Sequence, residues 1–223
     1  MKNVIKSVAI SMIMAVVFNS CSGGSGAPKV KDNPLFGNAL SIIASYKYEQ
    51  GKLREKRDKE YDNASSLEDL GNAQKKYEKK MQELNSKYEQ KAEAESNKIA
   101  GTEIPYVISD GLQYTIEGPV TAKSVWISDF MSCGVSVSFN IRIMKNLTRI
   151  DRAYVVGMAG DKPLAANMEF FLSQNSGKVN IGDVVPVIVS FSFSGDLNNW
   201  SDFNFIKFIS AAEWYPIYNE LEK

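Results

Sequence analysis

The sequence predicts an α+β protein: an N-terminal antiparallel helical hairpin of coiled-coil type, followed by an immunoglobulin-like antiparallel β-sandwich. Residues 47–98 contain 13 basic and 12 acidic residues, and their apolar side chains recur every three or four positions, which is the period of amphipathic helices. From Thr102 onward, apolar and polar residues alternate, as in half-buried strands. The expected units are a signal peptide (1–20), a tether (21–33), the hairpin (34–100) and the β-sandwich domain with a short C-terminal helix (101–223).

The first residues predict a secretory signal. Lys2 and Lys6 precede an uncharged, mostly apolar run, Val8–Phe18, which is too short to span a membrane. The run leads to Cys21 and then to the Gly- and Ser-rich residues 22–26. An apolar segment, a small residue and a cysteine resemble the lipobox of bacterial lipoproteins, in which the precursor is cut before the cysteine and the cysteine is acylated. The alternative is an ordinary signal peptide with an incidental cysteine.

Residues 34–100 predict two helices of about 28 and 32 residues. Pro34 suits the first turn of the first helix, and Ser65 with Glu68 fits a capping box at the start of the second. The short joint between them favours an antiparallel hairpin. Polar residues fall near the seam at Gln50, Gln74 and Glu95. A single long helix that dimerises is the alternative, so pairing within one chain or between two chains stays open.

The C-terminal half predicts about seven short strands. Val135–Ile143 alternates without a fault, and Val187–Phe193 nearly does so. Weaker strands are expected at 104–108, 112–117, 123–130, 152–159, 168–172 and 203–209. Turn-forming residues separate the strands, among them Gly118-Pro119. This number and spacing suggest an immunoglobulin-like sandwich, and Pro216–Glu222 is expected to close the chain as a helix.

The amino-acid composition limits the kinds of catalysis and binding that we expect. The chain has no histidine, the commonest general base and zinc ligand, so we expect a non-enzymatic protein without cofactor or metal. Carboxylate-based hydrolysis stays open because it does not require histidine. Equal numbers of basic and acidic residues, 26 of each, argue against a nucleic-acid partner. Cys133 is left without a disulfide partner if Cys21 is acylated.

The loop Asp196–Asn204 is the candidate ligand site. Asp196, Asn198 and Asp202 offer oxygen atoms, and Trp200 offers an aromatic face beside them, a combination that suits a glycan or another ligand. The alternative is an ordinary turn in which Trp200 folds back over the sandwich. Basic residues of the first helix alternate with acidic ones, which predicts a solvated helix with ion pairs rather than a polyanion site: Lys52, Arg54, Lys56, Arg57 and Lys59.

The order of lipobox, charged hairpin and β-sandwich resembles small lipoproteins of Gram-negative anaerobes. The resemblance implies attachment to the membrane through acylated (palmitate-bearing) Cys21. In the sorting of such proteins, an Asp after the cysteine favours the inner membrane, and here Ser22 follows it, so the outer membrane's periplasmic face is expected. The expected function is protein interaction or a structural role in the periplasm, with the hairpin binding another envelope protein; a glycan- or ligand-binding module is the alternative.

Overall fold

The α+β class is confirmed in the computed structural model, which describes residues 28–128, 132–145, 152–170, 179–193 and 196–221. In chain order the elements are α1 (Ala39–Asp62), α2 (Leu67–Ile99), β1 (Tyr106–Ile108), β2 (Tyr114–Ile127), β3 (Cys133–Ile143), β4 (Arg152–Ala159), β5 (Lys162–Phe170), β6 (Val184–Ser192), the 3-10 helix η2 (Leu197–Asp202), β7 (Phe205–Ile209) and α3 (Ala211–Leu221). Among these residues, no helix is long and apolar enough to cross a membrane.

The described strands form two sheets, ordered β1-β7-β4-β5 and β2-β3-β6. Most neighbouring strands are antiparallel, as the alternation predicted. The exception is β1, which pairs in parallel with β7 so that Tyr106 lies opposite Ile206. The expectation of a wholly antiparallel arrangement is therefore wrong at this edge. Parallel neighbours need a long connection, and nearly a hundred residues separate β1 from β7, so no local turn chemistry could indicate their pairing.

Two strand boundaries also differ from the prediction. The separate strands expected at 112–117 and 123–130 are one strand, β2, whose register against β3 shifts between Glu117 and Thr121. Gly118 and Pro119 are exposed at this irregularity, where a proline without an N–H is tolerated because the ladder is already interrupted. The strand expected at 168–172 begins earlier, at Lys162, directly after a turn at Gly160 and Asp161.

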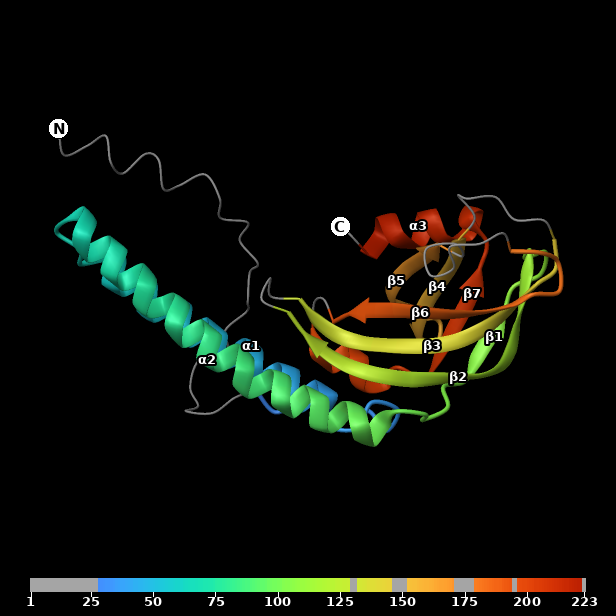
Figure 1. Ribbon diagram of the computed structural model, residues 1–223, viewed down its shortest axis with the longest axis horizontal. Coiled ribbons are helices and arrows are strands. Elements are labelled where there is room, and N and C mark those ends of the chain that lie inside the picture. Colours follow the sequence, from blue (N-terminus) through green and yellow to red (C-terminus); the bar gives the residue numbers. More distant parts are fainter. Residues whose placement is uncertain (1–27, 129–131, 146–151, 171–178, 194–195, 222–223) are drawn as a thin grey trace.

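One apolar core joins the two sheets and the base of the hairpin. Between the sheets, the rings of Phe139 and Phe208 meet edge to face with centroids 4.8 Å apart. From the hairpin side, Phe36 enters the same core and lies 4.8 Å from Phe203. Figure 1 shows the base of the hairpin beneath the sheets while its other end points away from them.

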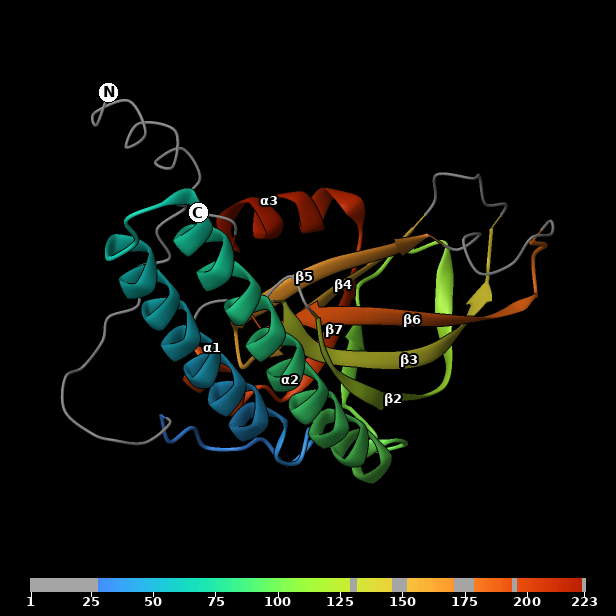
Figure 2. The ribbon, with the colours of Figure 1, turned by 60° about the vertical axis from the view of Figure 1, so that its left-hand side comes forward.

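Helix α3 covers the opposite side, over β4 and β5 (Figure 2). Trp214 is its anchor: it is buried against Val156 and Ile209, and its indole N–H donates to the carbonyl oxygen of Asn167 at 3.1 Å. The helix begins at Ala211 rather than at the expected Pro216, because Ser210 and Glu213 form reciprocal hydrogen bonds at its N-terminus.

The two long helices run antiparallel within one chain, as the hairpin prediction required. The capping box of α2 lies one residue later than expected, at Ser66 and Asp69, where both reciprocal hydrogen bonds form. Helix α1 begins at Ala39, so Pro34 does not lie in its first turn. It lies instead in a turn between Asn33 and Gly37, which pair as an isolated bridge.

The side chain of Asn33 holds this turn against η2. Its amide nitrogen donates to the carbonyl oxygens of Trp200, Ser201 and Phe203 at 2.7–3.2 Å. Its own carbonyl oxygen accepts from the backbone N–H of Leu35 at 2.9 Å, an Asx turn. The described start of the chain is thereby bound to η2, near the C-terminus of the sequence.

Candidate interaction surface on the helical hairpin

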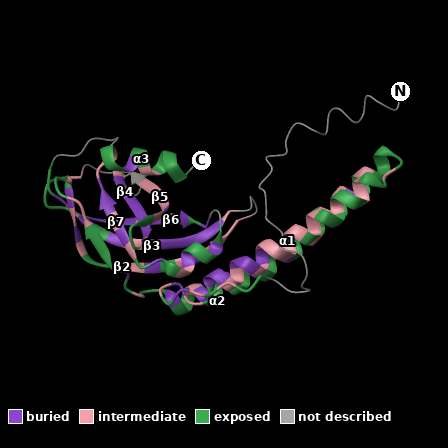
Figure 3. Ribbon diagram, turned by 180° about the vertical axis from the view of Figure 1, so that it is seen from behind, coloured by how far each residue is buried: buried purple, intermediate pink, exposed green. Residues whose placement is uncertain are grey.

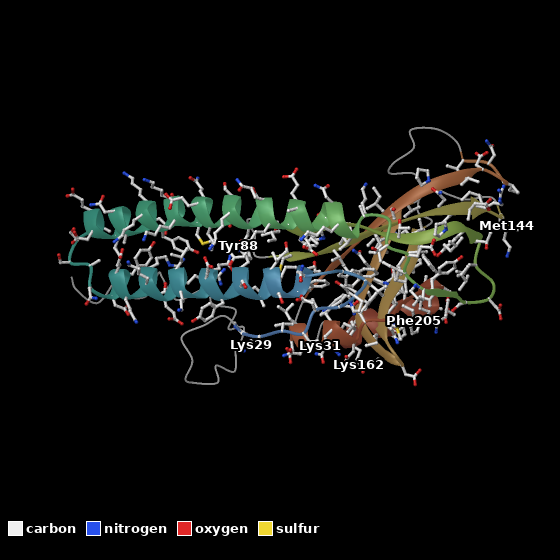
Figure 4. All side chains as sticks on the ribbon, turned by 90° about the horizontal axis from the view of Figure 1, so that it is seen from below. Lys29, Lys31, Tyr88, Met144, Lys162 and Phe205 are labelled. Atoms are coloured by element: carbon white, nitrogen blue, oxygen red, sulfur yellow. The ribbon has the colours of Figure 1, made fainter. Side chains whose placement is uncertain are left out.

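The inner half of the hairpin is held by an aromatic and polar seam. Tyr46 and Tyr88 pack with ring centroids 5.5 Å apart, and Tyr88 points between the helices in Figure 4. The hydroxyl of Tyr46 donates to Asn85 at 2.9 Å, and the amide of Gln50 donates to that hydroxyl. The hydroxyl of Tyr88 donates to Glu49, and burial together with this carboxylate raises the pKa of Tyr88 to about 12. The phenol therefore stays protonated as a donor at neutral pH.

At the base of the hairpin, a buried carboxylate connects the helices. Glu95 of α2 is only 3% exposed, and it accepts a 2.8 Å hydrogen bond from the backbone N–H of Asn38, the N-cap residue of α1. Lys98 lies 2.9 Å from the other oxygen. Burial raises the pKa of Glu95, but the hydrogen bonds from Asn38 and Lys98 outweigh burial and leave the pKa below its usual value. The Asn38 side chain forms no capping hydrogen bond; Asp32 accepts instead from the backbone N–H of Ser41 in the first turn, and Glu95 adds the hydrogen bond to the N-cap residue itself.

The outer part of the hairpin, residues 51–83, is here called the distal arm. Within it, only Ala73 is buried, whereas the inner parts of both helices bury several residues. Figure 3 shows this as a change from buried to exposed colouring along the helices. Most of the distal arm therefore contributes nothing to the core shared with the sheets.

A shallow groove runs between the two helices of the distal arm. Its lining residues come equally from both helices at helical spacing: Leu53, Lys56, Arg57 and Glu60 from α1, and Ala73, Lys76, Tyr77 and Lys80 from α2. Four of these side chains are cationic and one is anionic. The remaining three are Leu53, Ala73 and Tyr77, which give the groove its apolar part.

Some of the groove's charges are already paired. Arg57 contacts Asp58 at 2.7 Å, and its guanidinium lies 4.8 Å from the ring centre of Tyr77. Lys76 contacts Glu60 at 2.7 Å across the helices, and this hydrogen bond lowers the pKa of the Glu60 carboxyl. Sequence reasoning grouped the α1 cations as a solvated face with ion pairs. It missed the groove, because the facing residues of α2 become neighbours only through the register of the hairpin.

The two remaining groove cations have no such partners. Among the described residues, neither Lys56 nor Lys80 forms an ion pair or a hydrogen bond, although both place positive potential at Glu60. The groove therefore carries an excess of positive charge on a hairpin that is nearly neutral as a whole, with 13 basic and 12 acidic residues in its two helices.

The predicted ligand loop has a structural role in the observed fold. Trp200 is 1% exposed and packs on Phe193 and Phe203, with ring centroids 4.4 Å and 6.0 Å away, so its ring is not available to stack on a sugar. The side chain of Asp196 accepts from the backbone and amide nitrogens of Asn198, each at 2.9 Å, and caps η2. The turn interpretation therefore describes this segment better than the glycan platform does.

The other predicted ligand residues of this loop lie on the surface. Asn198 and Asp202 are exposed, and among the described residues no group of three or more Cys, Asp or Glu side chains is placed to hold a metal ion. Cys133 is buried, and burial raises the pKa of its thiol. Cys21, the predicted lipidation site, lies outside the described residues.

In comparisons with known proteins, no family model matches the sequence, and no curated protein or solved structure matches it either.

Proposed function

We propose that this chain is a lipid-anchored protein of the cell envelope, without enzymatic activity, whose hairpin holds a protein partner. The observation that supports the proposal is the distal arm. Residues 51–62 of α1 extend for roughly 18 Å and bury no side chain. Ordering such residues costs conformational entropy that the core does not offset, and a groove between two ordered helices is a common surface for binding an amphipathic partner helix.

The proposed anchor is acylated Cys21. A single acyl chain gives only marginal membrane binding, whereas the multiple chains of a bacterial lipoprotein give stable attachment. Asp32 accepts hydrogen bonds from the backbone and hydroxyl of Ser41, so the chain is held to the body from about this point. Eleven residues separate Cys21 from Asp32, and they reach at most about 40 Å even when fully extended. The body would therefore work close to the membrane surface, at the periplasmic face of the outer membrane if Ser22 directs sorting as expected.

For the fold, we infer more narrowly that the two sheets form an immunoglobulin-like β-sandwich. The support is the core between the sheets, where Phe139 of β3 packs on Phe208 of β7. The parallel β1–β7 pair departs from the usual pattern of such domains.

Two experiments in the native host test the proposed function. Cys21→Ser should leave the precursor unprocessed or move the protein from the membrane fraction to the soluble fraction. Equal cleavage and equal membrane fractionation of this variant would refute the anchor. For the arm, a photo-crosslinking amino acid at exposed Lys79 or at Lys80 should capture one defined envelope protein. The same amino acid at exposed Lys123, on β2, should not. Absence of arm crosslinks would refute the role of the hairpin.

A further inference from the structure

The groove of the distal arm has two chemical parts that together restrict its occupant. Leu53, Ala73 and Tyr77 provide apolar contacts between the helices. Ala73 is 7% exposed, so its neighbours cover most of its surface. Cationic side chains border this apolar part on both helices. An occupant therefore needs apolar side chains in the centre and acidic side chains on both flanks.

The geometry favours a helix as that occupant. Two antiparallel helices present between them a groove into which a third helix packs, with its apolar side chains in the spaces between four facing residues. The lining residues extend from 53 to 60 on α1 and from 73 to 80 on α2, about 10 Å of helix axis. This length matches roughly two turns of a partner helix.

The charge distribution distinguishes this occupant from a nucleic acid or an anionic membrane. Those partners require a broad basic surface, whereas the two helices carry 13 basic and 12 acidic residues overall. The positive excess is confined to the groove, where Lys56 and Lys80 lack ion-pair partners among the described side chains. A flanking pair of carboxylates would match these two ammonium groups.

We propose that the groove formed by Leu53, Ala73 and Tyr77 and bordered by Lys56 and Lys80 binds an acidic amphipathic helix of a partner protein. This proposal rests on the function proposed above and specifies the chemistry of its partner. Because the contact is short, the complex should be weak in solution, with micromolar affinity. Restriction of both proteins to one membrane surface would raise their effective concentration.

The test uses the chain without its signal peptide and a designed probe. The probe is a synthetic helical peptide of about three heptads, with Leu at the a and d positions and Glu at e and g. Two reference peptides carry Gln or Lys in place of Glu. The Glu peptide should bind at least about tenfold more tightly than the Gln peptide, the Lys peptide should not bind, and the preference should decrease as salt is raised from about 0.05 to about 0.3 M.

Two double variants locate the binding site. Lys56→Glu with Lys80→Glu should weaken binding of the Glu peptide at least about tenfold. The matched control, Lys75→Glu with Lys79→Glu, changes the net charge equally at exposed positions outside the groove lining and should alter binding less than about twofold. Circular dichroism verifies that both variants keep their helices. Equal binding of the Glu and Gln peptides, or equal losses in both double variants, would overturn the proposal.

Other results separate this inference from the proposed function. Crosslinking in cells from position 79, together with no binding of the Glu peptide, would leave the arm as a partner site and exclude the groove. Analytical ultracentrifugation tests whether the groove instead binds a second copy of this chain. A dimer that the Lys56→Glu and Lys80→Glu double variant abolishes would show that it does, and would also overturn the proposal.

Discussion

Replacement of Glu95 by Gln should destabilise the protein at neutral pH and not in acid. The substitution keeps the size of the side chain but removes the charge that accepts from the backbone N–H of Asn38 at 2.8 Å. Hydrogen bonds to charged groups are worth about 1.5–3 kcal/mol, against about 1 kcal/mol for neutral ones. A negative charge at the N-terminus of α1 adds about 0.3–1 kcal/mol. The expected loss in the free energy of unfolding is therefore about 1–3 kcal/mol at pH 7.

The dependence on pH follows from the direction of the pKa shift. The pKa of Glu95 is lower in the folded state than the usual value of 4.5. A lowered pKa stabilises the fold above the unfolded-state pKa, and this stabilisation is lost as pH falls through the folded-state pKa. Once protonated, Glu95 is neutral and resembles glutamine. The difference between wild type and Glu95→Gln should thus be smaller at about pH 3 than at pH 7, and it should vanish once the pH lies below the folded-state pKa.

Urea unfolding followed by circular dichroism at both pH values measures these differences. Glu93→Gln is the matched control, because Glu93 lies on the same helix but is exposed, and its effect should remain within about 0.5 kcal/mol. If Glu95→Gln were as stable as wild type at pH 7, the charge of the carboxylate would not stabilise the N-terminus of α1. If the loss were the same at both pH values, a packing defect rather than the charge would explain it.

Three further substitutions or reactions test the core. Trp200→Ala should cost about 3–5 kcal/mol in urea unfolding, because it removes a ring that is 1% exposed, and a cost below about 1 kcal/mol would contradict its burial. Gly134→Ala should disrupt the β3–β6 pair and lower the melting temperature, because a Cβ atom there would clash with the backbone carbonyl oxygen of Phe191. The control is Gly51→Ala, in helix α1, where an added Cβ atom meets no atom within 4 Å and should stabilise the protein by about 0.5–1 kcal/mol. If Gly51→Ala were less stable than Gly134→Ala, the close packing of β3 against β6 would be refuted. Cys133, buried and with a raised thiol pKa, should react with a thiol reagent only after denaturant is added, and rapid labelling of the native protein would argue against its burial.

Local patterns predicted much of the fold because they depend on neighbours in sequence. The strict alternation over Val135–Ile143 predicted β3, and the polar seam positions Gln50 and Glu95 are buried between the helices. The cap predicted at Ser65 is wrong by one residue, because both positions are serines and the backbone conformation, which the pattern does not give, selects Ser66. Where the start of a helix was misplaced, it was by five residues or fewer.

Features that depend on distant residues could not be predicted in this way. Trp200 is surrounded in sequence by polar residues, and its burial depends on Phe193 and Phe203 closing over it together with Phe36, more than 150 residues earlier. The parallel pairing of β1 with β7 has no local signal for the same reason. The groove of the distal arm also required the register between α1 and α2, which places Lys56 near Lys80.

The hydrogen bonds of Asn33 have a consequence for the order of folding. Its partners, the carbonyl oxygens of Trp200 and Phe203, lie 167 and 170 residues later, so the core cannot close until nearly the whole chain has emerged from the ribosome. Such distant contacts slow folding, because a long loop must be ordered before they form. The hairpin, whose contacts are local, can form first. A nascent chain would therefore keep the core between its two sheets open through most of its synthesis, even where neighbouring strands such as β2 and β3 have already paired.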